Sequence, residues 1–266
     1  MKARILFGTI IIILAGIFIF CIYKAIALNV ETQKSKASYE NARADYNRAV
    51  IEAEQETATS GIAEDAPEEP DPYVSIVRTM QLINPDYRGW LTIPDTVIDY
   101  PVVQSSNNSY YLKHDFYKND DKRGCPFIPW YCNTDSDNLI LYGHHFRTGD
   151  MFTQLDEFRD QDFAASHKIS LTTETGEHIY EVYAVFDMQV RGRPFHWDTP
   201  SFYSEEDFLD YLETAKSYSI INSNLDPQYG DKLLTLVTCE YKHGRYNGRL
   251  VVIACETVIT VDPGTE

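Results

Sequence analysis

A run of 19 residues without a charged side chain, Ile5 to Tyr23, constrains this chain more than any other feature of its sequence. A helix of about 20 apolar residues is long enough to span the hydrocarbon core of a bilayer. Lys2 and Arg4 precede the run, and positive charges favour the cytoplasmic side of a membrane. The sequence therefore predicts a membrane-spanning signal anchor within residues 1–28, with the rest of the chain outside the cell.

A cleaved signal peptide is the alternative interpretation of this segment. Ala25 to Ala27 has the small-x-small form of a cleavage site. The apolar run is longer than the ~7–15 residues of a signal-peptide core, so an uncleaved anchor is favoured.

The composition of the 266-residue chain excludes one class of partner. Its net charge is −17, whereas nucleic acids and strongly anionic surfaces bind proteins through clustered lysines and arginines. Apolar residues make up 44% of the chain, which is sufficient for a hydrophobic core.

Residues 29–56 contain no glycine or proline and are rich in good helix formers, which predicts a helix. Its apolar stripe is thin, so we expect a solvated stalk. A coiled coil is the alternative, because four apolar residues recur at sevenfold spacing: Val30, Ala37, Ala44 and Ile51. Residues 57–72 are rich in proline and acidic side chains, which predicts a disordered linker. The predicted domains are an anchor (1–28), a stalk with its linker (29–72) and a globular domain (73–266).

The predicted globular domain is mainly β. Eight short segments rich in β-branched or aromatic residues are separated by Gly, Pro, Asn or Asp, which predicts eight strands. Those segments are Trp90–Ile93, Val97–Val103, Gly124–Ile128, Asn138–Tyr142, Ile169–Thr173, His178–Gln189, Leu233–Thr238 and Leu250–Thr260. Strands at this spacing predict a closed β-barrel. Helical periodicity predicts a helix over Tyr73 to Ile83, and an N-capping Ser204 followed by acidic residues predicts another.

Three reactive or charged side chains stand at the ends of predicted strands. Cys239 follows the apolar run Leu233 to Thr238, and His144 comes shortly after the run Asn138 to Tyr142. Arg249 directly precedes the last strand. A cysteine acts as a nucleophile in its thiolate form, which a nearby cation favours. The pattern therefore predicts a nucleophilic cysteine beside a histidine and an arginine.

These motifs resemble those of the sortases, which are cysteine transpeptidases of Gram-positive cell surfaces. The resemblance rests on Thr235–Cys239 as the TLxTC motif, on Tyr142–His144 as the histidine motif, and on Arg249 before the last long strand. It extends through Gly89–Pro94 and Ile98–Gln104, which are similar to the opening strands of the sortase barrel. It thus covers most of the predicted globular domain.

The predicted helices narrow the resemblance to one class. A helix before the cysteine strand, together with an N-terminal helix, marks class B sortases. The resemblance then implies a membrane-anchored enzyme that cuts a C-terminal sorting motif of a surface protein and joins it to an amine of the peptidoglycan precursor, without a cofactor or metal. Two alternatives stay open: a pilin-polymerising sortase, whose acceptor is a lysine of another subunit, and a catalytically silent barrel that binds peptides.

The resemblance implies a role for each of the three side chains. Cys239 is the expected nucleophile, His144 transfers protons, and Arg249 hydrogen-bonds the substrate or the oxyanion. His145 and Arg245 are neighbouring alternatives, but position within the motifs favours His144 and Arg249.

Four residues are predicted to contact the substrate: Asn108, Leu112, Thr238 and Glu240. The first two match positions of the class B substrate groove, and the last two directly flank Cys239. Glu240 either contacts the substrate strand or is solvated, and a carboxylate beside a thiolate would raise the pKa of the thiol.

The other cysteines have less specific interpretations. A disulfide between Cys125 and Cys132 is permissible outside the cell, but we do not favour it. A zinc site formed by these cysteines with His144 or His145 is less favoured still, because the spacing fits no common zinc template. Nucleotide-binding, zincin and serine-hydrolase motifs are absent from the sequence.

Overall fold

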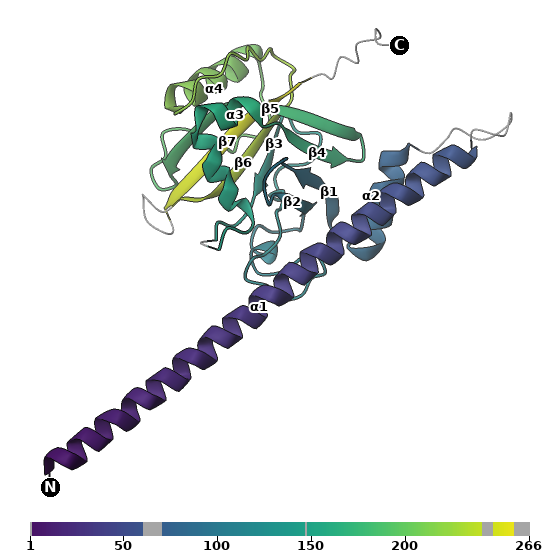
Figure 1. Cartoon of the computed structure of the whole chain (residues 1–266). Helices are drawn as coiled ribbons and strands as arrows, with labels where there is room; N and C mark the ends of the chain where they lie inside the picture. The colour runs from purple at the N-terminus through teal and green to yellow at the C-terminus, as the bar shows by residue number, and fades with distance from the viewer. Residues whose placement is uncertain (1, 61–70, 147, 241–246, 258–266) are drawn as a thin grey trace. The chain divides into compact units, whose positions relative to one another are not determined.

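The computed structural model describes residues 2–60, 71–146, 148–240 and 247–257. The chain divides into two compact units, Met1–Asn41 and Ala42–Glu266. The first unit is part of the long helix α1 (Lys2–Ser60), and the second unit contains a β-sheet with the other helices (Figure 1).

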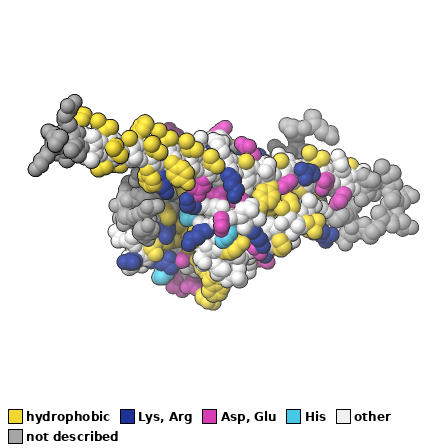
Figure 2. Space-filling view, turned by 90° about the horizontal axis from the view of Figure 1, so that it is seen from below, with side chains coloured by type: hydrophobic (Ala, Val, Ile, Leu, Met, Phe, Trp, Pro, Cys, Tyr) yellow, Lys and Arg dark blue, Asp and Glu magenta, His cyan; other side chains and the backbone are white. Residues whose placement is uncertain are grey.

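The helix of the first unit contains the predicted membrane span. By length and composition, the part of α1 from Phe7 to Ala58 includes a segment able to cross a membrane. Figure 2 shows apolar side chains gathered along the N-terminal end of this helix. Such a surface is stable in hydrocarbon and costly in water.

The second unit is organised around one mixed sheet. Its strands in the described residues are β1 (Tyr87–Thr92), β2 (Asp99–Val103), β3 (Asn138–Tyr142), β4 (Ile169–Thr173), β5 (Gly176–Gln189), β6 (Leu233–Glu240) and β7 (Gly248–Glu256). They lie in the order β2-β1-β4-β5-β7-β6-β3. Neighbouring strands are antiparallel except for β3 and β6, which are parallel. The long strand β5 pairs with β7 along most of its length and so joins the two halves of the sheet.

The sheet has seven strands in the described residues, whereas eight were predicted. The segment expected to form the eighth, Gly124–Ile128, makes isolated bridges instead. Phe127 bridges Val103 of β2 on one side and Tyr142 of β3 on the other. Pro126 has no N–H to donate to a ladder, which limits how far the pairing extends. The two edge strands are therefore linked through a short bridging segment and not through a full strand.

Both predicted helices of the globular part are confirmed. Helix α2 (Pro72–Ile83) begins after Asp71, whose side chain accepts a hydrogen bond from the Tyr73 amide. Helix α4 (Glu205–Tyr218) begins after Ser204, whose hydroxyl oxygen accepts a bond from the Asp207 amide. Three shorter helices were not predicted: η1 (Tyr110–Leu112), η2 (Phe152–Arg159) and α3 (Gln161–Ser166).

The expectation of a solvated stalk is wrong for the later part of α1. The residues from Ala42 onward belong to the second unit, and Ala42, Ala49 and Ala53 are buried in its core. Tyr46 stacks on Trp90 of β1 with 4.4 Å between the ring centroids. This half of the helix is therefore part of the globular fold. The predicted linker falls largely on residues 61–70, which lie outside the described residues.

Candidate active site

The sheet topology brings Cys239, His144 and Arg249 to one end of the sheet. Strands β3 and β6 are parallel, so both finish at the same end, and the antiparallel strand β7 begins there. Cys239 and Arg249 are direct cross-strand partners. Tyr142 is paired with Val237, which places His144 beside the end of β6. Segments about a hundred residues apart in the sequence thus converge on one site.

Cys239 stands at the boundary between core and solvent. The strand before it is buried, including Leu236 and Val237, whereas the side chain of Cys239 is half-exposed. A thiol in this position is accessible to a substrate while its backbone is fixed by pairing with Arg249 of β7. This combination suits a nucleophile.

Thr238 links the end of β6 to the histidine segment. Its side chain is 2% exposed, and its hydroxyl donates to the carbonyl of Gly143 at 2.8 Å. The Gly143 amide in turn donates to the Val237 carbonyl at 3.1 Å. These two bonds extend the β3–β6 pairing past the last residue of β3. The threonine before the cysteine therefore holds the histidine segment, and its contact with substrate stays a prediction.

Gly143 leaves room for the ring of Phe152 beside the histidine segment. A Cβ atom at this position would lie 2.5 Å from the ring of Phe152, closer than real Cβ contacts occur. The Phe152 amide also donates to the carbonyl of His144 at 2.9 Å. The glycine of the histidine motif is thus required by a packed aromatic ring.

His144 is oriented by a backbone carbonyl. Its Nε2 lies 2.9 Å from the carbonyl oxygen of Leu112, the last residue of η1. A carbonyl oxygen only accepts, so Nε2 carries a proton and Nδ1 is the nitrogen that exchanges protons in the neutral ring. Burial lowers the pKa of His144, the Leu112 bond raises it, and the charge of Arg249 lowers it; the net shift is downward.

His145, the neighbouring alternative, is held in a separate network. Its Nε2 lies 2.8 Å from the carboxylate of Asp156. Asp156 pairs with Arg159, which also pairs with Asp187 of β5. The two neighbouring histidines therefore have different partners: His145 binds Asp156, whereas His144 binds the Leu112 carbonyl.

The other residues predicted at the site differ in their surroundings and burial. The side-chain oxygen of Asn108 accepts a hydrogen bond from the Trp130 amide at 2.9 Å, and the Trp130 side chain is 64% exposed. Leu112 is half-buried, and its clearest contact is the carbonyl bond to His144. The side chain of Glu240 and all of Arg245 lie outside the described residues.

Cys125 and Cys132, the two cysteines considered for a disulfide, are separate buried thiols. Cys125 donates to the carbonyl of Pro101 at 3.4 Å, and Cys132 lies 3.4 Å from the hydroxyl of Ser136. Burial raises the pKa of both thiols. Among the described residues, no group of three His, Cys, Asp or Glu side chains is arranged to hold a metal ion.

Comparison with known proteins defines the class of this chain. A sortase domain matches residues 91–257. Sortase B of Listeria monocytogenes is 32% identical over 256 residues, which cover 95% of this chain and 97% of the relative. Sortase B of Staphylococcus aureus is 26% identical over 246 residues, covering 91% of this chain and 93% of the relative. The chain belongs to the sortase family of cysteine transpeptidases.

Solved structures agree with this assignment. The structure of Clostridium perfringens sortase B superposes with a TM-score of 0.61 at 32% identity, covering 68% of this chain and 98% of that one. The Staphylococcus aureus sortase B–substrate complex has the same fold, with a TM-score of 0.73 at 24% identity over 87% of this chain and 100% of that one. Within its family this protein is a class B sortase.

Proposed function

We propose that this class B sortase cuts a C-terminal sorting motif with Cys239 as nucleophile, His144 as general acid and base, and Arg249 as oxyanion or substrate donor. The observation that carries the proposal is the convergence of these three residues at one end of the sheet. Cys239 and Arg249 are cross-strand partners, and His144 is fixed beside them by Gly143 and the Leu112 carbonyl.

The reaction divides into two transfers of the same acyl group. The Cys239 thiolate attacks the carbonyl carbon of the scissile peptide bond, and protonated His144 gives its proton to the departing amine as the C–N bond breaks. A thioester remains on Cys239. An acceptor amine then attacks this thioester, loses its proton to His144 and releases the thiolate. Protons balance over the cycle, because His144 loses one and regains one.

Arg249 is suited to stabilise the negative charge that forms on the carbonyl oxygen. A guanidinium stays protonated and presents five N–H donors in a rigid plane. Its Nη1 donates to the Gly248 carbonyl at 2.8 Å, which holds the guanidinium against the start of β7. Side chains of directly paired residues lie on the same face of a sheet, so the guanidinium and the thiol of Cys239 share one side.

The substrate groove is proposed to run past Asn108, Leu112 and Glu240. The loop between β5 and α4 forms a further wall. Arg193 pairs with Asp198 at 2.9 Å and stacks over the ring of Trp197, which gives this loop a defined conformation. A rigid wall of mixed charge and aromatic surface suits a polar sorting motif.

We place the enzyme in the cell membrane by a single span, with the sheet domain outside. The support is the apolar N-terminal segment of α1 and the charges of Lys2 and Arg4 before it. The partners would be a surface protein that bears the motif and an amine of the peptidoglycan precursor. In this proposal the bridging segment at Phe127 completes the sheet as a closed barrel.

Cleavage of a small peptide panel tests the proposal. The full chain in detergent micelles is incubated with quenched fluorescent peptides of LPxTG-like, NPxTN-like and PPxTG-like sequence, with and without an added amine. We expect one motif to be cleaved and the Cys239→Ala variant to be inactive. His144→Ala and Arg249→Ala should each lower the rate by about a hundredfold or more. Wild-type rates in either variant would remove that residue from the mechanism.

A further inference from the structure

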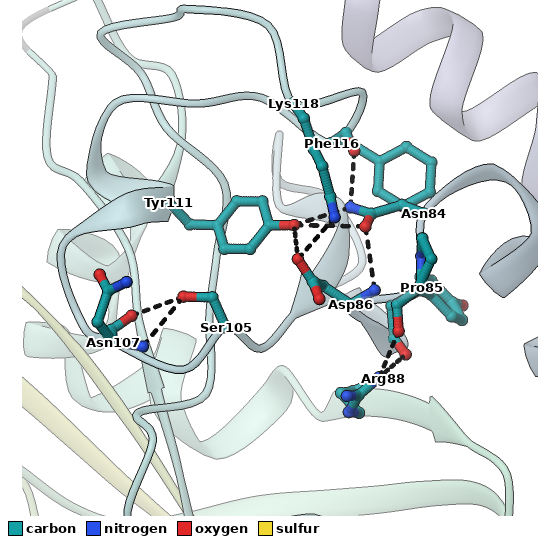
Figure 3. Close-up of polar contacts among 10 residues, drawn as sticks. Asn84, Pro85, Asp86, Arg88, Ser105, Asn107, Tyr111, Phe116 and Lys118 are labelled. Atoms are coloured by element: carbon teal, nitrogen blue, oxygen red, sulfur yellow. Dashed lines mark hydrogen bonds and ion pairs between the residues drawn. The ribbon is translucent and has the colours of Figure 1, made fainter.

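A polar cluster that is buried at Asn84 and Tyr111 and reaches the surface at Lys118 lies beside the short helix η1 (Figure 3). The hydroxyl of Tyr111 donates to the Asp86 carboxylate at 2.7 Å. The side-chain amide of Asn84 donates to the Tyr111 hydroxyl at 3.0 Å and to the Phe116 carbonyl at 2.8 Å. Lys118 completes the cluster with an ion pair to Asp86 at 3.0 Å. We name these four side chains, Asn84, Asp86, Tyr111 and Lys118, the Tyr111 cluster.

The cluster fixes how deeply the Tyr111 ring enters the core. Tyr111 and Asn84 are each 1% exposed, so their polar atoms have little access to water. A phenylalanine ring could fill much of the same space, but it would make none of these directional bonds. The hydroxyl therefore ties η1 to the turn between α2 and β1, where Asn84 and Asp86 lie.

The backbone of η1 is held from its other side as well. The Cys125 amide donates to the Tyr111 carbonyl at 2.9 Å. Gly124 has a φ of +63°, and a Cβ atom there would lie 2.2 Å from the same carbonyl oxygen. The chain can approach η1 this closely only with glycine at position 124. Side chain and backbone thus fix the same residue, Tyr111.

The next residue in the chain is the one that contacts the histidine. Leu112 ends η1, and its carbonyl accepts the bond from Nε2 of His144 at 2.9 Å. A displacement of Tyr111 would move this carbonyl directly, because one peptide unit separates them. We propose that Tyr111, held by Asn84 and Asp86, is a positioning residue for His144 that acts through the Leu112 carbonyl. This inference rests on the proposed role of His144.

The orientation of the His144 ring has a chemical consequence for the proton transfers. While the Leu112 carbonyl binds Nε2–H, the neutral ring keeps one tautomer and directs Nδ1 to the proton transfers. If the carbonyl shifts, the ring can rotate and populate the other tautomer. Proton transfer then slows, whereas substrate binding by the groove is little affected. The expected signature is a lower kcat with an unchanged KM.

The test compares two tyrosines whose hydroxyls both bind carboxylates. Tyr111→Phe removes the bond to Asp86, and the control Tyr117→Phe removes the bond from Tyr117 to Asp45 on α1. Both variants are made in the full chain in detergent micelles. We measure kcat and KM on the cleaved peptide. The tautomer and pKa of His144 are read from ¹⁵N signals assigned with His144→Gln.

We expect Tyr111→Phe to lower kcat by about threefold to tenfold, to leave KM unchanged, and to reduce the share of the Nε2–H tautomer. Tyr117→Phe should leave kcat, KM and the share of the Nε2–H tautomer at wild-type values. Asp86→Asn, which keeps the shape of the acceptor, should act in the same direction by a smaller factor. It also serves as the test if Tyr111→Phe fails to fold.

Unchanged His144 signals in folded Tyr111→Phe or Asp86→Asn protein would overturn the inference. So would an equal response to Tyr117→Phe, since that would indicate a general loss of stability. The histidine signals do not depend on turnover. If His144→Ala kept full activity, the proposed mechanism would fail, while a shifted tautomer in Tyr111→Phe would still show that the cluster positions the ring.

Discussion

In the proposed mechanism, His144 works under two opposing demands. It must be protonated to release the first amine and neutral to accept a proton from the second. Burial lowers its pKa, and the nearby charge of Arg249 lowers it too, while the Leu112 carbonyl raises it. The histidine therefore stays neutral at lower pH than an exposed histidine, which suits its role as the base in the second transfer.

This balance predicts a pH dependence. The first transfer needs protonated His144, so the alkaline limb of kcat/KM should follow the His144 pKa and lie below pH 6.5, the ordinary value for histidine, because the net shift of that pKa is downward. Arg249→Gln removes a positive charge that disfavours the imidazolium, so the pKa of His144 should rise. The check is a ¹⁵N titration of His144, with exposed Arg191→Gln as the control. A fall in the pKa of His144 in Arg249→Gln would contradict the assigned geometry.

The glycine before His144 offers a second test at the residue scale. Gly143→Ala would place a Cβ atom 2.5 Å from the Phe152 ring, so the histidine segment must shift. Overpacking of this kind costs about 1–3 kcal/mol, and we expect kcat to fall with the free energy of unfolding. Phe152→Leu removes ring atoms at the contact. The double variant should therefore be less destabilised than the sum of the two single changes, and strict additivity in chemical denaturation would argue against the clash.

The sequence could predict the residues of the proposed mechanism, but not the contacts that orient their side chains. Cys239, His144 and Arg249 each stand out because a reactive or charged side chain ends or begins an apolar run. The Leu112 carbonyl that binds His144 leaves no such signal, since every residue has a carbonyl. Thr238 was predicted to contact substrate because it adjoins the cysteine. Its burial became apparent only from the pairing of β6 with β3.

At the scale of elements, the later half of α1 is the clearest difference from expectation. Buried alanines give a weak hydrophobic signal, so the packed face of this helix looked like a thin stripe. The predicted eighth strand failed for another reason. Pro126 and Pro129 flank the segment that bridges β2 and β3, and residues without an N–H cannot extend a ladder. Most of the other strands lie where the alternation of apolar and polar residues, together with the turn residues, predicted them.

The packing of α1 predicts that this helix stabilises the catalytic domain. Tyr46→Ala removes a ring that stacks on Trp90, so the free energy of unfolding should fall by roughly 2 kcal/mol. Tyr203→Ala is the control, because Tyr203 is 97% exposed. Thermal unfolding followed by tryptophan fluorescence measures both. Equal melting temperatures for the Tyr46→Ala and wild-type proteins would mean that the helix does not support the fold.

At the scale of the whole molecule, the topology explains why the active site forms only in the folded chain. The parallel pair of β3 and β6 joins segments that are distant in the sequence, and such pairs need a long connection. In this chain the connection contains η2, α3, β4, β5 and α4. The histidine and the cysteine therefore meet only after most of the sheet has formed. Substitutions of buried residues in the β4–β5–β7 part of the sheet, with Arg249 excepted, should thus act on activity through folding.

The cysteines allow the orientation of the whole chain in the membrane to be tested. Cys239 is half-exposed, Cys125, Cys132 and Cys255 are buried, and Cys21 lies within the apolar run. A permanently charged maleimide cannot cross a bilayer, because a charge in hydrocarbon is costly. Applied to intact cells that carry the full chain in their membrane, it should label the wild type.

The Cys239→Ser variant should remain unlabelled in the same cells, because the other thiols are shielded by protein or lipid. Labelling of the wild type only after the membrane is permeabilised would place the sheet domain on the cytoplasmic side. That result would contradict the orientation inferred from Lys2 and Arg4. It would leave the catalytic roles untouched, since those depend on the strand ends and not on the side of the membrane.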